Sequence, residues 1–244
     1  MFHLIYNRPM NLAKISENIV FYESDFENGN LKFNSVLKKF EHIAVNHAES
    51  VGVGFEDMLK QNLLWVTLRI KYQILNNPLP NEQLLLTTCA SGKNALEFDR
   101  DFIIESKRGI LIKGTSKWCL IDKDTRHISK LLCLSPFDNI LQKPIFEEKF
   151  LKTEIFDTNN MQPNFEYQVR NEDIDKNGHM NNTIYAKILQ IPNNKLINFF
   201  QINFMHEALV NQKILVYKKE FENKTIFIGK FDNDTVSFTA EIRF

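Results

Sequence analysis

The sequence predicts an α+β protein in which an antiparallel sheet wraps around a central helix, twice in tandem. Three observations predict this fold. A long helix with an apolar face precedes several short alternating segments, the same order of elements recurs in the second half, and a proline-containing stretch without periodicity separates the two halves. The repeat lies in the order of the elements and not in residue identity, so we expect an internal duplication of one α+β unit.

The first helix is predicted at 33–51, because apolar residues recur there every three or four positions. Gly52 and Gly54 then mark its end. A half-exposed strand follows at 66–74, where apolar and polar residues alternate. Three more strands are expected at about 83–90, 96–105 and 110–121. The turns between and after them are expected at Ser91–Asn94, Lys107–Gly109 and Asp122–Asp124.

The stretch 135–163 contains three prolines and no sustained periodicity, so it is interpreted as a connection. Beyond it we expect a strand at 165–173, a helix from about Asn181 to Gln190, and strands at 199–207, 213–220, 224–231 and 235–243. The predicted organisation is an N-terminal domain at 1–145, a linker at 146–164 and a C-terminal domain at 165–244.

The composition and the motifs argue against several classes of function. Lys and Arg together number 30, and Asp and Glu together also number 30. The chain therefore has no net charge that would favour binding to nucleic acid or to an anionic membrane. The N-terminus does not resemble a signal peptide and no stretch approaches the length of a membrane span, so a cytoplasmic location is expected. The sequence contains neither the glycine-rich loops that bind nucleotide phosphates nor the G-x-S-x-G motif of serine hydrolases.

The cysteines do not form a structural framework. Cys89, Cys119 and Cys133 are odd in number and include no C-x-x-C pair, which argues against disulfides and against a zinc ribbon. We expect them to be buried apolar residues. His42 and His47 lie five positions apart in the first helix and do not share a face well enough to bind a metal ion.

The stretch 173–185 concentrates carboxylate, carboxamide and imidazole groups. Its first half fits a calcium loop, but Ile184 occupies the position where such a loop needs a glutamate. A simple Asx turn would explain the Asp and Asn residues but does not require His179. If the segment is extended, Asp175, Asn177 and His179 point to one side, because strand side chains alternate.

Six of these residues fit the pattern D-x-N-x-H-x-N-N-x-x-Y, namely Asp175, Asn177, His179, Asn181, Asn182 and Tyr185. With them the chain resembles the fatty acyl-acyl-carrier-protein thioesterases, which have two hotdog domains in tandem. The segment from Gly114 to Arg126 around Trp118, and the helix from Phe40 to Gly52, are also similar to that family. The resemblance covers roughly residues 20 to 244.

The resemblance implies hydrolysis of an acyl thioester, which releases a free fatty acid from acyl carrier protein without a cofactor or a metal. The family has a catalytic glutamate after its second helix, usually followed by cysteine; here the matching residues are Glu207 and Ala208. A cysteine nucleophile is therefore absent from this position, which favours attack by water. The expected catalytic residues are Asp175, Asn177, His179 and Glu207.

Each of these residues has an expected role. Glu207 takes a proton from water, and His179 positions that water and protonates the departing thiolate. Asn177 orients the water or the thioester oxygen, while Asp175 holds a neighbouring side chain or merely caps the turn. Backbone N–H groups near Met180 and Asn181 are expected to stabilise the oxyanion.

Several alternatives stay open. One alternative is a related hotdog enzyme that acts on acyl-CoA, and another is a protein that binds acyl chains without turnover. The N-terminal domain is expected to shape the acyl pocket, with contributions from the 33–51 helix and the strand from Trp65. His206 is interpreted as a core or edge residue beside Glu207. Basic residues such as Arg126 and Lys130 are candidates for contact with an acidic carrier protein, and a homodimer is one candidate assembly.

Overall fold

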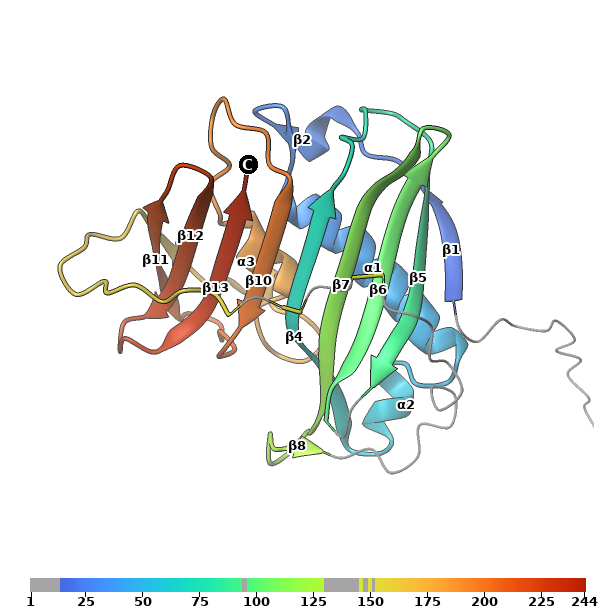
Figure 1. Cartoon of the computed structure of the whole chain (residues 1–244). Helices are drawn as coiled ribbons and strands as arrows, with labels where there is room; N and C mark the ends of the chain where they lie inside the picture. Colours follow the sequence, from blue (N-terminus) through green and yellow to red (C-terminus); the bar gives the residue numbers. More distant parts are fainter. Residues whose placement is uncertain (1–13, 94–95, 130–144, 147–148, 151) are drawn as a thin grey trace, which may run out of the picture.

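The computed structural model describes residues 14–93, 96–129, 145–146, 149–150 and 152–244. Its main feature is one antiparallel sheet that contains eleven of the described strands (Figure 1). The first half contributes β1 (Lys14–Ile19), β4 (Leu63–Ile74), β5 (Leu84–Lys93), β6 (Phe98–Ser106), β7 (Gly109–Asp122) and β8 (Ile128–Ser129). The second half contributes β9 (Phe165–Gln168), β10 (Phe199–Phe204), β11 (Lys213–Glu220), β12 (Lys224–Phe231) and β13 (Val236–Arg243).

The two halves join edge to edge. The strand order is β1-β5-β6-β7-β4-β10-β13-β12-β11-β9, with β8 paired to β7. β4 and β10 pair from Gln73 opposite Phe199 to Arg69 opposite Asn203, so the inner edges of the two halves protect each other. A separate small hairpin consists of β2 (Phe26–Glu27) and β3 (Asn30–Leu31).

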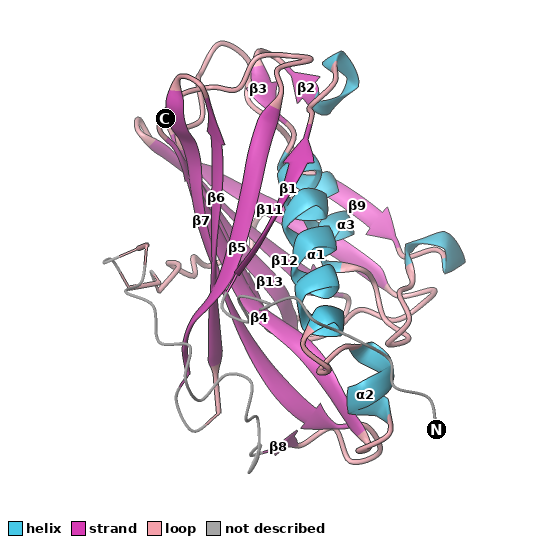
Figure 2. Ribbon diagram, turned by 90° about the vertical axis from the view of Figure 1, so that its right-hand side faces the viewer, coloured by secondary structure: helices cyan, strands magenta, loops and turns pink. Residues whose placement is uncertain are grey.

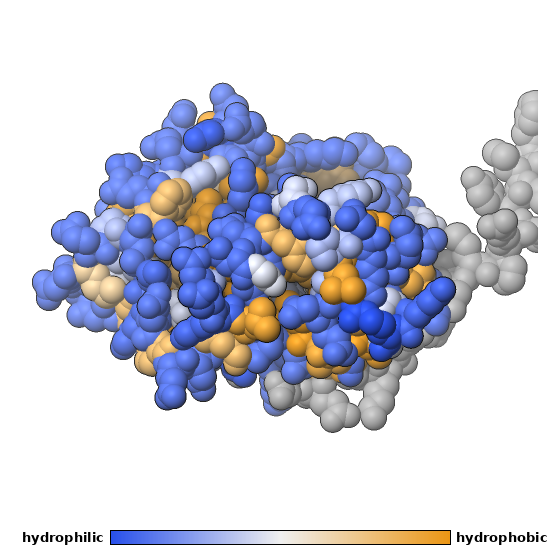
Figure 3. Space-filling view, turned by 90° about the horizontal axis from the view of Figure 1, so that it is seen from above, coloured by the Kyte–Doolittle hydropathy of each residue, from blue (hydrophilic) through white to orange (hydrophobic). Residues whose placement is uncertain are grey.

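The helices α1 (Phe33–Ser50), α2 (Phe55–Leu59) and α3 (Asn182–Lys187) all lie on the same side of the sheet (Figure 2). The predicted architecture, a helix packed against an antiparallel sheet in each half, is confirmed. None of the helices in the described ranges is long and apolar enough to cross a membrane. Seen from above, polar residues cover most of the surface and apolar residues lie between them in small groups (Figure 3).

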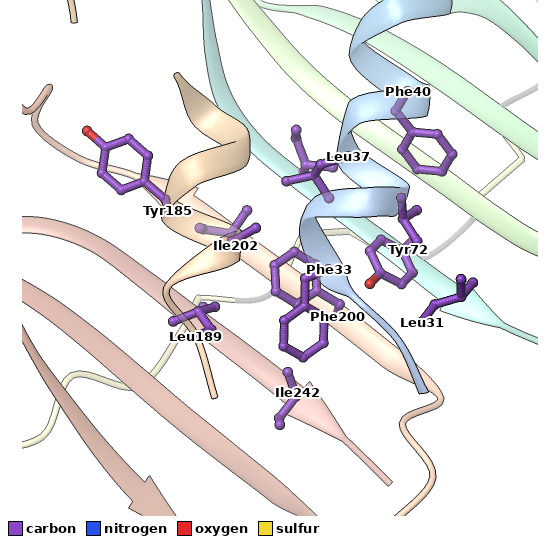
Figure 4. Packing of buried hydrophobic residues seen from close by; sticks show 14 of the residues in the cluster. Leu31, Phe33, Leu37, Phe40, Tyr72, Tyr185, Leu189, Phe200, Ile202 and Ile242 are labelled. Atoms are coloured by element: carbon purple, nitrogen blue, oxygen red, sulfur yellow. The ribbon is translucent and has the colours of Figure 1, made fainter. Parts of the chain in front are cut away.

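The aromatic core connects the two halves. Phe33 of α1 stacks on Phe200 of β10 with ring centroids 4.6 Å apart, and Tyr72 of β4 lies 5.2 Å from Phe200 (Figure 4). Phe40, further along α1, stacks on Phe102 of β6 at 4.1 Å. All five side chains are essentially buried. One continuous apolar core therefore runs under both halves of the sheet.

Most predicted elements are present, with shifted ends. β11 and β12 match the prediction, and α1 ends one residue early. The predicted strand at 165–173 ends at Gln168, because residues 171–173 form a 3-10 turn around the buried Asp173 carboxylate. Ser91–Lys93 belong to β5 instead of a turn, and α3 ends at Lys187 instead of Gln190. β1 and α2 were not predicted. The predicted connection at 135–163 lies partly outside the described residues.

A short structural repeat precedes the main helix of each half. Asp25 ends a 3-10 turn at Glu23–Asp25, and its Oδ2 accepts a hydrogen bond from the N–H of Tyr22 at 2.8 Å. Asp173 does the same for Arg170 at 2.9 Å. The carbonyl of each aspartate then accepts a hydrogen bond from the N-cap residue of the following helix, Lys32 or Asn181, at 2.8 Å in both cases.

Candidate active site

The segment from Ile174 to Met180 is a tight turn and is not extended. Ile174 and Met180 form a bridge, and the carbonyl of His179 accepts from the N–H of Asp175 at 2.9 Å. The carbonyl of Asp175 accepts from the N–H of Gly178 at 3.1 Å, and Gly178 has φ of 88°, which favours glycine. The turn nevertheless places Asp175, Asn177 and His179 along one cavity.

Asp175 stabilises the turn itself. Its Oδ1 accepts a hydrogen bond from the backbone N–H of Asn177 at 2.8 Å, which is an Asx turn. The same oxygen lies 3.9 Å from Nδ1 of His179, which is too far for a hydrogen bond. The geometry thus favours a role for Asp175 in holding the turn, one of the two roles that the sequence left open.

Glu207 approaches His179 from the other side. Its Oε1 lies 3.2 Å from Nε2 of His179, and the His179 side chain is only 12% exposed. Glu207 was expected on a strand, but β10 ends at Phe204 and Glu207 lies in the segment that follows. This segment is fixed because the N–H of His206 donates to the carbonyl of Ser237 at 3.0 Å and the N–H of Ala208 donates to Oη of Tyr185 at 2.9 Å.

Arg126 joins the same cluster, although the sequence indicated it only as a carrier-protein contact. Its guanidinium is hydrogen-bonded to Glu207, and its Nη2 lies 2.8 Å from Nε2 of His179. A guanidinium only donates, so Nε2 of His179 accepts in that contact. Once Nε2 is protonated it no longer accepts from Arg126 and can donate to Glu207 instead. Lys130, the other basic residue named with Arg126, lies outside the described residues.

Hydrogen bonds hold the turn that presents Arg126. Oδ1 of Asp122 accepts from the N–H groups of Thr125 at 2.8 Å and Asp124 at 3.1 Å, and these contacts lower the pKa of the Asp122 carboxyl. The N–H of Arg126 donates to the carbonyl of Asp122 at 2.9 Å, and Arg126 has φ of 60°. Arg126 is the last residue of the segment around Trp118 that resembles the thioesterases. This position was the one indication in the sequence that Arg126 could belong to the site.

The expected backbone oxyanion donors are already used. The N–H of Met180 donates to the carbonyl of Ala208 and the N–H of Asn181 donates to the carbonyl of Asp173, each at 2.8 Å. That expectation was wrong, because both groups fasten the turn to its surroundings. The side-chain oxygen of Asn177, in contrast, is buried without a hydrogen-bond partner among the described residues and lies at the cavity. A buried polar atom of this kind is suited to bind water or a substrate.

Asn181 connects the site to the first helix. Its Oδ1 accepts from the N–H of Thr183 at 2.8 Å and caps α3, while its Nδ2 donates to Glu41 of α1 at 2.9 Å. Burial raises the pKa of the Glu41 carboxyl; the hydrogen bond from Asn181 opposes this shift and the charge of Asp175 adds to it. Asn181 and Glu41 therefore fix the start of α3 against α1.

Replacing Asn181 with alanine is expected to lower the free energy of unfolding by about 1 kcal/mol, because α3 loses its cap. Asn181→Ser, which keeps a capping oxygen, is the matched control and should retain most of that stability. Urea denaturation followed by circular dichroism measures both variants. Equal losses in the two variants would show that capping is not the role of this side chain.

A cavity of about 470 Å³ extends from this cluster between α1 and the sheet. Its walls are mainly apolar, and they include Leu37 and Ala44 of α1 and Phe98, Phe102 and Trp118 of the sheet. Asp175, Asn177, His179, Glu207 and Arg126 line one part of it. Apolar walls with a few convergent polar groups are typical of a site for a small or chain-like ligand.

The remaining side chains singled out by the sequence lie elsewhere or have structural contacts. Cys89 and Cys119 are buried, as predicted; burial raises the pKa of both thiols, to about 11 for Cys119, which disfavours the nucleophilic thiolate. Cys133 lies outside the described residues. Nδ1 of His206 lies 2.7 Å from the carbonyl of Val236, consistent with the edge position that was expected. No group of three or more metal-ligating side chains occurs in the described part of the chain.

Two family models match the chain. The model of the acyl-ACP thioesterase N-terminal domain matches residues 13–133, and the model of the acyl-ACP thioesterase C-terminal domain matches residues 157–230. An acyl-[acyl-carrier-protein] hydrolase of Cuphea viscosissima is 30% identical over 107 residues, which are 40% of this chain and 26% of that protein. Oleoyl-acyl carrier protein thioesterase 1 of Arabidopsis thaliana is 25% identical over 205 residues, 72% of this chain and 56% of that protein.

The alignments thus span between about a quarter and just over half the length of these two curated relatives. Among solved structures, an acyl-ACP thioesterase from Bacteroides thetaiotaomicron superposes with a TM-score of 0.85 at 23% identity. The superposition covers 95% of this chain and 97% of that one. The two proteins share one fold over nearly their whole length.

Proposed function

Because the chain belongs to the acyl-ACP thioesterase family and has its hotdog fold, we propose that it hydrolyses acyl thioesters of acyl carrier protein and releases free fatty acids. One observation carries this proposal: the Glu207 carboxylate, the His179 imidazole and the Asn177 amide meet at one cavity whose walls are mainly apolar. The cavity accommodates an acyl chain, and the three polar groups lie where a thioester carbonyl and a water molecule would meet.

In the proposed mechanism Glu207 accepts a proton from water, whose oxygen attacks the thioester carbonyl carbon. The carbon–sulfur bond then breaks and the sulfur leaves as a thiolate. The proton passes from Glu207 to Nε2 of His179, 3.2 Å away, and from there to the thiolate. The products are a fatty acid and the free thiol of the phosphopantetheine arm. No further proton donor is required.

Asn177 and Arg126 support this step. The amide of Asn177 orients the water or the thioester oxygen, which is supported by its buried oxygen without a protein partner among the described residues. The guanidinium of Arg126 holds Glu207 and His179 next to each other and places positive charge beside the carbonyl oxygen as it becomes negative. Asp175 acts indirectly, by fixing the turn through the N–H of Asn177.

We further propose that residues 1–145 form an acyl-pocket domain, 146–164 a linker and 165–244 a domain that supplies the catalytic carboxylate, imidazole and amide. In support, α1 and β6 line the apolar part of the cavity, while Asn177, His179 and Glu207 come from the second half. Residues 152–164 contain neither helix nor strand. Arg126 is the exception, because it belongs to the first half but contacts His179 and Glu207 of the second half.

The test is mass analysis of the fatty acids released from a panel of acyl carrier proteins, with acyl-CoA substrates of the same chain lengths beside them. Hydrolysis that favours the carrier-protein substrates supports the proposal. Hydrolysis of acyl-CoA alone would instead support a CoA-specific hotdog enzyme. Chain binding without any release of product would identify an acyl-binding protein without turnover.

A further inference from the structure

The two halves of the sheet have the same plan on either side of the junction between β4 and β10 (Figure 1). Outward from β4 the strands are β7, β6, β5 and β1, and outward from β10 they are β13, β12, β11 and β9. The end of β5, the start of β6 and the end of β7 line the cavity beside Glu207, called here the first cavity. The corresponding places in the second half are the end of β11, the start of β12 and the end of β13.

A second cavity, of about 330 Å³, lies at these corresponding places. Lys218 and Glu220 of β11, Thr225 and Phe227 of β12 and Ile242 of β13 line it. Another wall is the segment 190–195, which follows α3 as the lining residues 53–55 of the first cavity follow α1. Since α3 has six residues and α1 has 18, an irregular segment here takes the place of a helix. The second cavity is therefore the structural counterpart of the first.

The turn that precedes α1 corresponds to the polar turn that precedes α3, but it contains no histidine. Nδ2 of its Asn28 donates to the carbonyl of Ile191 at 3.2 Å, and Nδ2 of Asn30 donates to the carbonyl of Lys195 at 2.9 Å. Both amides thus hold the 190–195 wall of the second cavity. No histidine occurs among the described residues that line this cavity. We expect a ligand to bind there without being hydrolysed.

The charged side chains that line the second cavity are two lysines and one glutamate. Nζ of Lys218 pairs with Oε1 of Glu220 at 2.9 Å. Nζ of Lys195 donates to the carbonyl of Glu222 at 3.2 Å and lies 4.3 Å from the ring centroid of Phe244. The hydrogen bond from Lys218 lowers the pKa of the Glu220 carboxyl, and the charge of Lys195 adds to this shift. Together these side chains carry one positive charge, which matches a ligand with one negative charge.

Thr225 adds a hydroxyl group to the floor of the second cavity. It lies opposite Glu220 of β11 and Ile242 of β13 and is only 4% exposed. Its hydroxyl has no hydrogen bond among the described residues, although it lines the cavity. A polar group in such a position costs free energy that an oxygen atom of a ligand would recover. Beside it, the buried side chains of Phe227 and Ile242 form an apolar surface.

We propose that the second cavity binds an amphipathic monocarboxylate, that is, a short fatty acid, at a site separate from the proposed reaction centre. The carboxylate would lie near Lys195, Lys218 and the hydroxyl of Thr225. The chain would lie against Phe227 and Ile242. The chain is short because about 330 Å³ is near the lower end of the usual range for small-ligand sites, about 300–1,000 Å³. A phosphate monoester, with about −1.5 to −2 charges at neutral pH, matches the single positive charge less well.

The test is calorimetric titration of the protein with octanoate, and with octan-1-ol as the uncharged ligand of equal chain length. Tryptophan fluorescence is recorded in parallel. Both tryptophans of the chain, Trp65 and Trp118, line the first cavity and neither lines the second. Binding of octanoate to the second cavity should therefore release or absorb heat and leave the fluorescence unchanged. Octan-1-ol should bind there at least about tenfold more weakly, because it lacks the charge.

Two variants locate the binding. Thr225→Val removes the hydroxyl and keeps a similar shape, and Lys218→Met removes the charge at similar length. Each should weaken the fluorescence-silent binding of octanoate about tenfold or more. Lys213→Met is the matched control: Lys213 lies on the same strand but pairs with Glu166 at 3.3 Å and does not line the cavity. This control should bind octanoate as the wild type does.

The inference is overturned if octanoate does not bind, or if the change in tryptophan fluorescence accounts for all of its binding. Equal affinity for octanoate and octan-1-ol would also contradict it, and so would unchanged affinity in either Thr225→Val or Lys218→Met. The comparison of the two ligands uses the wild type and stays decisive if a variant does not fold. The inference does not depend on thioester hydrolysis, so a protein without that activity would refute the proposed function alone.

Discussion

Replacing Glu207 with glutamine is expected to lower kcat for thioester hydrolysis by a factor of about 10² to 10⁴, the usual contribution of a general base. Glutamine keeps the size and shape of the side chain but cannot accept a proton from water. It also keeps an oxygen that can accept from Arg126, so the segment after β10 should stay in place. Steady-state kinetics with an acyl carrier protein substrate measures the effect, and KM should change little.

The matched control is Glu166→Gln. Glu166 lies on the edge strand β9, half exposed, and its carboxylate pairs with Lys213 at 3.3 Å. This variant should retain wild-type kcat. Circular dichroism and the urea midpoint must show that both variants are folded. A folded Glu207→Gln protein with undiminished kcat would remove Glu207 from the mechanism.

Replacing Phe200 with alanine is expected to lower the free energy of unfolding by about 3–5 kcal/mol, the usual range for a buried phenylalanine. Phe200 is completely buried and contacts Phe33 of α1 and Tyr72 of β4, so its ring joins elements of both halves. Its removal leaves a cavity at the junction of β4 and β10. Urea unfolding followed by tryptophan fluorescence and circular dichroism measures the loss.

Phe165→Ala serves as its control, since Phe165 is 39% exposed on the edge strand β9. Its effect should be far smaller, within about 1 kcal/mol. Because Phe200 lies in the core shared by both halves, its loss should move the whole unfolding transition. A loss below about 1 kcal/mol in Phe200→Ala would contradict the packing described for this junction.

Local patterns in the sequence predicted most elements well. Spacing of three and four residues predicted α1, and alternation of apolar and polar residues predicted the 66–74 part of β4, because burial on one face selects the same periodicity in the sequence and in the structure. The ends were less predictable. Asp173 looked like part of a strand, but its buried side chain accepts hydrogen bonds from Tyr167 and Arg170 that close a turn. Such a contact depends on where neighbouring groups lie.

The candidate site, too, could be predicted only in part from local sequence patterns. Asp175, Asn177, His179 and Glu207 were selected from the sequence, and the structure brings all four to one cavity. Their individual roles as catalytic residues stay predictions. Arg126 was missed as a member of the site, because it lies 53 positions from His179 and 81 from Glu207 along the chain. Only the pairing of β7 with β4, and of β4 with β10, brings its turn to the second half.

The sequence by itself determined the order of helices and strands, the duplicated plan and the polar turn at 173–182, because these depend on neighbours within a few residues. Only the tertiary structure decided which groups share the cavity, and that the N–H groups of Met180 and Asn181 are already used. Those facts depend on distances between strands that are remote in sequence, which periodicity does not encode.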